Sequence, residues 1–277
     1  MAMIYVASLP MLGSAQQRPE RFERREQPVV VPPTVFHSQQ SANLPTAQTI
    51  SKGAWLFEIS HRFFPPVADG FQALWGLDGP VANRLGLAYA VSDRAMVGVV
   101  RTNIDDNLEL NAKTRLLDGG TESIPVMIGV KGGFAWNMSD PGESGAGDNE
   151  SQTYAQVMLN ALIGDRLGVG LVPTVLRNPR IQDTEPETTL ALGIHGQAYI
   201  SEQVSLLGEW IISRRQPDLE HDSGTLGIEL ETGGHFFKIV LTNQYRMNPT
   251  QVLGGTPYQF KPRYWRLGFN VTRLLTF

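Results

Sequence analysis

Ser60 and His61 are the adjacent pair that comes nearest to a hydrolytic site, because a histidine can activate a serine as a nucleophile. The pair lies in a segment whose apolar and polar side chains alternate, which is the period of a β-strand. Neighbouring residues of a strand point to opposite faces, so these two side chains cannot meet. We therefore predict no catalytic residue here, and interpret His61, near Phe63, as a residue at an interface between apolar and polar surroundings.

The histidines show no spacing typical of a metal site. They are His37, His61, His195, His221 and His235. His195, on the same predicted strand face as Gln197, is best explained as an ordinary polar position. The acidic, glycine-rich stretch 140–150 is explained by a mobile surface loop without calcium. Since the sequence also lacks a phosphate loop, a zinc-protease motif and a nucleophile elbow, we expect neither a metal nor a cofactor.

The composition excludes further classes. The 277 residues include no cysteine, which rules out disulfides, thiolate metal sites, cysteine nucleophiles and a lipoprotein acylation site. A net charge of -4 with a pI near 5.8 gives no electrostatic reason to expect a nucleic-acid partner. Because there is no apolar run of roughly 18 residues, the chain could cross a membrane only as a closed barrel.

After Lys52 the sequence consists of stretches of about ten residues in which apolar and polar side chains alternate. In one of them, for example, Leu108 and Leu110 flank Glu109. We expect about 12 such strands, each long enough for the tilted wall of a transmembrane barrel. The predicted strands are 53–64, 83–91, 95–102, 107–117, 123–136, 152–163, 166–176, 188–200, 203–213, 224–232, 235–246 and 262–277.

The connections between these strands sort into two kinds. Every second one is brief: 92–94, 118–122, 164–165, 201–202 and 233–234. Those between are mostly long, with only 103–106 short: 65–82, 137–151, 178–187, 214–223 and 247–261. Outer-membrane barrels have short turns toward the periplasm and long loops outside. The sequence therefore predicts an all-β fold, a transmembrane antiparallel up-and-down barrel with both termini on the periplasmic side.

One face of each strand is apolar and the other carries the charged side chains. A soluble barrel would bury the apolar face, whereas a membrane barrel would turn it toward lipid. About 12 long strands enclose a lumen too wide for side chains alone to fill, which favours the membrane arrangement. The charged residues then expected to line the lumen are Glu58, Arg62, Arg84, Arg101, Glu109, Lys113, Arg115, Lys131, Glu209, Glu229, Glu231, Lys238, Arg246 and Arg266.

Basic residues outnumber acidic ones in this lumen set. The charges could form a salt-bridged network that braces the wall or packs a plug. They could instead line a narrow pore, which would favour anions because rings of arginine and lysine do so. Both interpretations stay open at this stage.

The first 50 residues differ from the rest. Residues 1–15 contain a short apolar stretch that ends in small residues, which predicts a signal peptide cleaved after Ala15. Residues 16–50 are rich in Gln, Pro, Arg and Glu without a sustained period, so we expect a flexible periplasmic tail. Residues 51–277 then form the barrel, and the expected location is the cell outer membrane of a Gram-negative-type bacterium.

Aromatic residues lie toward strand ends on the apolar face, as in the interfacial girdles of membrane barrels. The C-terminus alternates to a last apolar residue, Phe277, in a series that includes Trp265 and Phe269. This series is typical of the signal by which outer-membrane barrels are recognised for assembly. The expected partners are the barrel-assembly machinery, outer-membrane lipid and small solutes. Arg273 interrupts the apolar face and must reach toward the interface.

Several segments carry a resemblance to a known family. They are ISHRFF at 59–64, WGLDGPVANRLGLAYAVSDR at 75–94, GVVRTN at 98–103, ETGGHFFKIVLTNQYRMN at 231–248 and RLGFNVTRLLTF at 266–277. In these segments the chain resembles a family of bacterial outer-membrane β-barrel proteins of unknown function, from Bacteroidetes-like and related bacteria. The resemblance implies a fold and a location, and no activity or ligand. The motif positions to be inspected first as lumen or rim contacts are Arg62, Asp78, Arg84, Arg101, Gly234 and His235.

The sequence thus favours a non-enzymatic outer-membrane barrel that acts as a small-solute channel or as the membrane anchor of an envelope assembly. Two alternatives stay open. One is an outer-membrane hydrolase that acts on lipid, and the other is a soluble periplasmic barrel that binds lipid.

Overall fold

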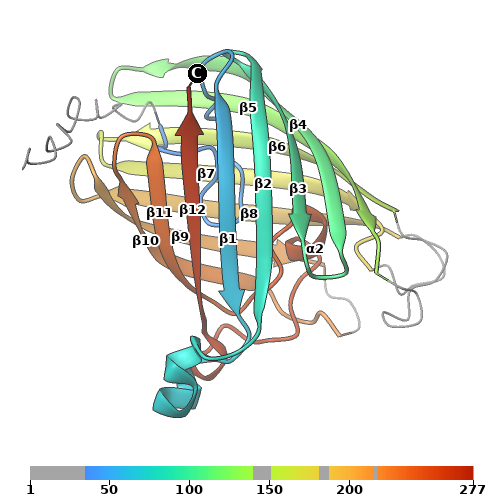
Figure 1. Cartoon of the computed structure of the whole chain (residues 1–277). Helices are drawn as coiled ribbons and strands as arrows, with labels where there is room; N and C mark the ends of the chain where they lie inside the picture. Colours follow the sequence, from blue (N-terminus) through green and yellow to red (C-terminus); the bar gives the residue numbers. More distant parts are fainter. Residues whose placement is uncertain (1–34, 140–150, 181–186, 215–217, 277) are drawn as a thin grey trace, which may run out of the picture.

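The described residues form one closed antiparallel barrel in which each strand pairs with its neighbours in sequence and β1 pairs with β12 (Figure 1). The structure, a computed structural model, describes residues 35–139, 151–180, 187–214 and 218–276. The strands are β1 (Trp55–Phe63), β2 (Val81–Ser92), β3 (Ala95–Thr102), β4 (Asn107–Thr121), β5 (Ile124–Asn137), β6 (Ser151–Ile163), β7 (Leu167–Arg177), β8 (Thr188–Tyr199), β9 (Val204–Ser213), β10 (Ser223–Glu231), β11 (His235–Thr242) and β12 (Arg266–Leu275).

The predicted strands and their up-and-down order are confirmed. Strand β3 has the predicted bounds, and most others begin and end close to them. Two predicted strands were too long, because β11 ends at Thr242 and β12 begins only at Arg266. The connection between them contains Pro249, Pro257 and Pro262. A proline lacks the N–H that a strand ladder needs, so the sheet cannot continue through this connection.

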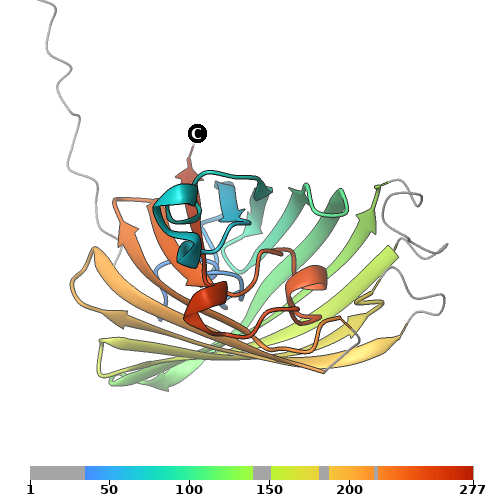
Figure 2. The same ribbon diagram turned by 90° about the horizontal axis from the view of Figure 1, so that it is seen from below.

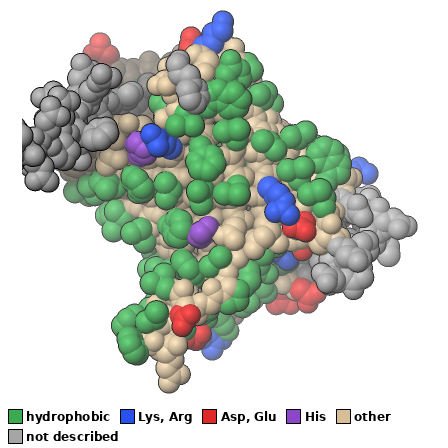
Figure 3. Space-filling view, viewed as in Figure 1, with side chains coloured by type: hydrophobic (Ala, Val, Ile, Leu, Met, Phe, Trp, Pro, Cys, Tyr) green, Lys and Arg blue, Asp and Glu red, His purple; other side chains and the backbone are tan. Residues whose placement is uncertain are grey.

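Most outward side chains of the wall are apolar, and the inward ones are mainly polar, apart from an apolar cluster around the plug that includes Met158 and Leu176. In β4, Leu110 is exposed whereas Glu109 and Lys113 are buried. Figure 3 shows hydrophobic side chains spread over the outer face. So large an apolar surface is unfavourable in water but suits the hydrocarbon of a bilayer. The alternative of a soluble barrel with an apolar interior does not fit this arrangement.

Ile239 offers a direct test of which face contacts lipid. It lies in the middle of β11, points outward and is 65% exposed. We expect Ile239→Lys to destabilise the barrel in a bilayer by about 2–4 kcal/mol, the cost of a lysine near the midplane of a transmembrane barrel. Denaturant unfolding in lipid vesicles measures this difference, with Glu220→Lys in an exposed loop as the control. Equal stability of the two variants would contradict the lipid-facing assignment.

Residues 35–50 lie inside the barrel. Figure 2 looks into the barrel and shows this segment in the space that the strands enclose. Most of its side chains are buried, including those of Phe36, Leu44 and Thr46. The prediction of a flexible periplasmic tail over 16–50 is therefore corrected for residues 35–50, which we call the plug. The earlier part of the predicted tail and the predicted signal peptide lie outside the described residues.

The connection between β11 and β12 covers the end of the barrel opposite the short turns. It contains α2 (Pro249–Val252), whose residues are buried, and η2 (Pro262–Tyr264). Asn248 Nδ2 donates to Asn107 Oδ1 at 2.6 Å, which fastens the connection to the wall. A further element, η1 (Val67–Gly76), projects from the end of β1 (Figure 1). Within the described ranges, no helix combines the length and apolarity needed to cross a membrane.

Candidate functional site in the barrel lumen

The plug is a hairpin. Backbone hydrogen bonds join Ser41 N to Leu44 O at 2.8 Å and Thr46 N to Gln39 O at 3.1 Å. The chain therefore reverses between residues 41 and 44, and these residues form the tip of the plug.

Both ends of the plug lie at the short-turn end of the barrel. The Tyr199 hydroxyl, at the end of β8, donates to Val35 O at 3.0 Å. The Thr49 hydroxyl donates to Asp93 O, in the turn between β2 and β3, at 2.7 Å. The hairpin thus enters the lumen from the predicted periplasmic side and returns to that side, where β1 begins.

Glu209 of β9 holds the tip of the plug. Its Oε1 accepts the backbone N–H groups of Ala42, Asn43 and Leu44 at 2.7, 2.9 and 2.9 Å. Its Oε2 accepts the Asn43 side-chain amide at 3.0 Å. Successive backbone N–H groups that converge in this way form a concave anion-binding site. The wall therefore supplies a buried carboxylate that satisfies the N–H groups of the turn.

Lys113 of β4 binds carbonyl oxygens of the plug backbone, whereas Glu209 binds its N–H groups. Its Nζ donates to the carbonyl oxygens of Gln39, Thr46 and Gln48 at 3.1, 3.3 and 2.6 Å. One buried ammonium thus joins both arms of the hairpin to the wall. A buried ammonium is tolerated only when its donors are satisfied, and here carbonyl oxygens of the plug satisfy them.

Lys238 of β11 contacts the first arm of the hairpin. Its Nζ donates to Gln40 O at 2.5 Å and to Ser41 O at 2.8 Å, and lies 3.0 Å from Glu229 Oε2. Glu229 Oε1 in turn lies 3.2 Å from Nδ1 of the plug residue His37. This cluster combines an ion pair within the wall with direct contacts to the plug.

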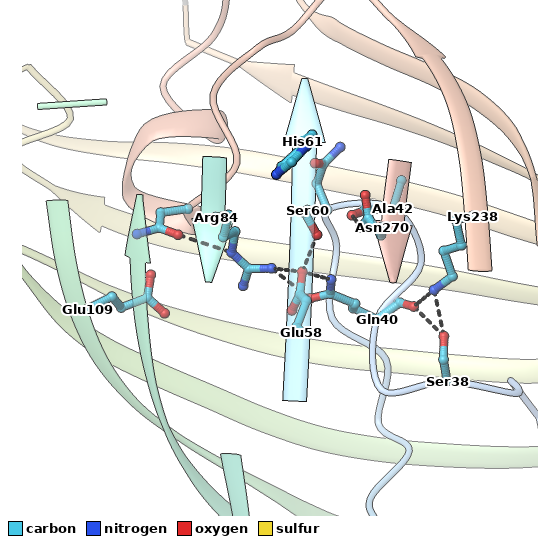
Figure 4. Close-up of polar contacts among 12 residues, drawn as sticks. Ser38, Gln40, Ala42, Glu58, Ser60, His61, Arg84, Glu109, Lys238 and Asn270 are labelled. Carbon is cyan, nitrogen blue, oxygen red and sulfur yellow. Dashed lines mark hydrogen bonds and ion pairs between the residues drawn. The ribbon is translucent and has the colours of Figure 1, made fainter. Parts of the chain in front are cut away.

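Arg84 and Glu58 form a buried ion pair beside the plug, as Figure 4 shows. The Glu58 carboxylate also accepts the Gln40 side-chain amide at 2.8 Å and the Ser60 hydroxyl at 2.6 Å. Glu58 Oε1 therefore accepts from side chains of both the wall and the plug. The arrangement joins β1, β2 and the plug in one polar network.

Arg62 reaches the tip from β1 and is fully buried. Its guanidinium donates to the side-chain oxygens of Asn43, at 3.1 Å, and of Asn270, at 2.7 Å. The Asn270 amide donates to Ala42 O at 2.7 Å. The tip is thus enclosed by Glu209 on one side and by Arg62 and Asn270 on the other.

Glycines of the wall make room for the apolar side chains of the plug. A Cβ on Gly193 would lie 2.5 Å from Leu44 Cδ2, and one on Gly168 would lie 3.0 Å from a ring carbon of Phe36. The Phe36 ring also stacks on His195, with ring centroids 4.8 Å apart. Larger residues at these two wall positions would exclude the plug from its present place.

Most charged residues predicted for the lumen point into the barrel. Those buried there are Glu58, Arg62, Arg84, Glu109, Lys113, Glu209, Glu229, Glu231, Lys238 and Arg266. Lys131 also points inward, with Nζ 3.9 Å from Glu109 Oε1. Arg115 lies near the short-turn rim, where its Nε is 3.3 Å from Asp118 Oδ1. The predicted set thus contains both contacts to the plug and pairs within the wall.

One of the predicted lumen positions is wrong, and another lies at the mouth of the barrel and not on a strand. Arg101 lies on the outer face of β3, exposed, with its guanidinium 2.6 Å from Asp106 Oδ1. It follows the outward parity of Val97 and Val99, and at a strand end it can reach water. Arg246 lies beyond the end of β11, in the connection to β12, where it lines a cavity at the mouth of the barrel.

The predicted assembly signal lies only partly on a strand. Trp265 precedes β12, and Phe269 points outward, with its ring centroid 4.5 Å from that of His61. Phe277 is outside the described residues. Arg273 is exposed on the outer face of β12. In the strand register it lies opposite His235, the first residue of β11.

The space left in the lumen is divided. A cavity of about 70 Å³ lies between the plug and the wall beside Glu58 and Lys131. Another, of about 360 Å³, lies at the short-turn end beside His37. A third, of about 400 Å³, lies at the opposite end beside Arg246 and Gln251 and shares no lining residue with the other two. In the described part of the chain, the plug and the α2 connection therefore stand between the two ends.

Ser60 and His61 do not meet. The Ser60 hydroxyl points inward and donates to Glu58, whereas the His61 ring packs on Phe269 at the outer face. Among the residues that the structure describes, no group of three or more His, Asp or Glu is placed to hold a metal ion.

Comparisons with known proteins agree with the barrel. A family model described as a membrane-bound β-barrel domain (DUF5777) matches residues 36–275, and so includes the plug. Comparison with curated proteins finds no match. Among solved structures, an outer membrane channel from Pseudomonas putida F1 has 12% identity and a TM-score of 0.51, covering 83% of this chain and 98% of that one. The KdgM and NanC porins have 7% and 8% identity, each with a TM-score of 0.47, covering 81% and 79% of this chain and 99% and 98% of theirs.

Proposed function

This chain belongs to the family of membrane-bound β-barrel domains (DUF5777), and we propose that it is a non-enzymatic small-solute channel of the outer membrane whose lumen the plug closes. One observation carries the proposal. The wall holds the backbone of the plug through charged side chains, with Glu209 on its N–H groups and Lys113 and Lys238 on its carbonyl oxygens. The plug is therefore bound as a polar ligand would be.

The plug is held by both kinds of contact, since Phe36 and Leu44 also belong to an apolar cluster with wall residues such as Met158, but its charged contacts can be exchanged for water. When a plug held by apolar packing leaves, apolar surface is exposed to water, and the cost rises with its area. When hydrogen bonds to charged groups are exchanged for water, the net cost is about 1.5–3 kcal/mol each. If the plug left, water would fill the lumen and solvate Glu209, Lys113 and Lys238. The open barrel would then leave none of these three charges buried without a partner.

The charges around the plug indicate the class of solute. The buried basic residues of the central lumen are Arg62, Arg84, Lys113 and Lys238, with Lys131 beside them, and the buried acidic ones are Glu58, Glu109, Glu209 and Glu229. Such a lumen suits hydrophilic solutes, with a weak preference for anions because the basic side chains are in slight excess. The Pseudomonas putida protein of the same fold is described as an outer membrane channel, which supports a channel function.

Planar-bilayer recordings test the proposal. We expect the full chain to be mostly closed, and a chain that starts at residue 51 to conduct steadily, since it lacks the plug but keeps every strand. Arg101→Glu in the shortened chain is the matched control, because Arg101 faces outward and should leave selectivity unchanged. A shortened barrel that is folded by circular dichroism yet electrically silent would remove the channel and favour a membrane anchor.

A further inference from the structure

η1 carries a group of exposed apolar side chains. Phe71, Leu74 and Trp75 are 72%, 44% and 52% exposed, and Leu77, directly after η1, is 52% exposed. The rings of Phe71 and Trp75 contact each other edge to face, with centroids 5.6 Å apart. Figure 3 shows hydrophobic side chains gathered on this projection. We call these four residues the apolar tip.

The backbone holds the apolar tip outward against its own preference. Leu74 and Trp75 have φ angles of 43° and 53°, in the left-handed region that bulky residues seldom adopt. Strain of this kind persists only where the surrounding structure enforces it, and it is concentrated at functional positions. The exposure of Trp75 is therefore a specified feature of the loop.

The projection is fixed to the barrel at its base. Val67 N donates to Trp265 O at 2.7 Å, which ties the start of η1 to the start of β12. A Cβ on Gly76, which has a φ of 96°, would lie 2.6 Å from Pro65 O. Glycine is thus required where η1 returns past the end of β1. These contacts hold both ends of η1 beside the wall.

The projection leaves the wall sideways. Strands of a transmembrane barrel are tilted by about 35–45° from its axis, and in Figure 1 the front strands cross those behind them. Because η1 extends beyond the end of β1, it moves away from the barrel axis as well as along it. On the adjoining wall, the outward rings of Phe63 and Phe269 lie 6.3 Å apart. The apolar tip thus continues the lipid-facing surface beyond the strands.

Charged residues flank the apolar tip. η2 contacts η1 and carries the exposed residue Arg263, with the exposed Lys261 directly before it. Cations beside an apolar surface suit the boundary of a bilayer, where anionic headgroups lie above acyl chains. Asp69 and Asp78 on the same projection are exposed and suit its water-facing side.

The geometry points to η1 as an interfacial anchor that inserts the apolar tip into the headgroup and upper acyl region of the outer leaflet, beside the barrel. Aromatic side chains favour this region because they have an apolar body and tolerate its polar edge. The anchor acts on lipid that surrounds the barrel. It rests on the membrane assignment of the wall and does not depend on whether the plug ever leaves the lumen.

Single-cysteine labelling tests the anchor, since the chain has no cysteine of its own. Phe71→Cys and Leu77→Cys, each carrying an environment-sensitive nitrobenzoxadiazole dye, report on the apolar tip in vesicles of phosphatidylcholine and phosphatidylglycerol. Leu226→Cys on the outer wall is the control for lipid, and Glu220→Cys in an exposed loop is the control for water.

We expect the dyes at both tip positions to emit at shorter wavelength than the dye at 220, and to be quenched by lipids that carry a nitroxide near the headgroup. Emission that matches position 220, with quenching by aqueous iodide and none by nitroxide lipids, would overturn the anchor. The dye at position 226 shows independently whether the barrel itself is inserted. Both tip positions must agree, so disruption by one substitution cannot decide the outcome.

Discussion

Glu209→Ala is expected to turn a mostly closed barrel into a conducting one. The Glu209 carboxylate accepts the N–H groups of Ala42, Asn43 and Leu44 at 2.7 to 2.9 Å. Hydrogen bonds to a charged group contribute about 1.5–3 kcal/mol each, although water entering the site recovers part of the loss. If the plugged state loses about 3–4 kcal/mol, the ratio of open to closed barrels rises by roughly 10²–10³-fold.

Single-channel recordings of the full chain give the open fraction directly. Glu209→Gln should have a smaller effect, because an amide oxygen still accepts N–H groups but carries no charge. Glu231→Ala is the matched control, since Glu231 is also buried in the wall but its carboxylate accepts the N–H of Gly234, in the turn after β10. If the Glu209→Ala barrel is folded and closed as often as the unmodified chain, the carboxylate does not hold the plug shut.

The strands could be predicted because their cause is local. Each has lipid on one side and polar groups on the other, so side chains alternate with a period of two, and the turns between strands need glycine or aspartate. Strand β4 illustrates this, since Leu108 and Leu110 flank the buried Glu109 and its first residue, Asn107, matches the prediction. Closure of the barrel then follows, because an open sheet edge is not tolerated in hydrocarbon.

The plug could not be predicted because its partners lie far away in sequence. Ala42 and Glu209, which are hydrogen-bonded, are separated by 167 positions. Wall side chains form hydrogen bonds with the backbone of residues 35–50, so this segment needs no alternation of apolar and polar residues. Its sequence therefore resembles that of a flexible tail. One signal was present in the wall, where Gly168 and Gly193 occupy inward positions and leave room for plug side chains.

Arg101 shows the limit of reasoning from charge. Its strand is apolar on both faces, with Val97 and Val99 outside and Met96 and Val100 inside. The period of two therefore did not settle which face was which, and the positive charge alone suggested the lumen. Near the end of a strand an arginine can lie on the outer face, because its guanidinium reaches the water beyond the interface.

Ala47→Cys combined with Gly129→Cys is expected to lock the lumen closed under oxidising conditions. A Cβ on Gly129, inside β5, would lie 3.3 Å from Ala47 Cβ of the plug. Disulfides need a separation of about 3.5–4.5 Å between Cβ atoms, so a small outward shift of either backbone allows the bond. The same Cβ would lie 2.9 Å from Thr114 O, and Gly129→Cys alone is therefore the control for wall distortion.

The lock is most informative in the Glu209→Ala background, where the plug is expected to be out of place most of the time. Oxidation should then abolish the conductance, and a reductant should restore it within the same recording, because the disulfide holds the plug in place whereas the contacts left in this variant do not. Neither single cysteine should respond to either reagent. Persistent conductance in a barrel whose disulfide is verified by mass spectrometry would mean that ions pass while the plug is in place. The charged contacts around residues 35–50 would then brace the wall without gating it.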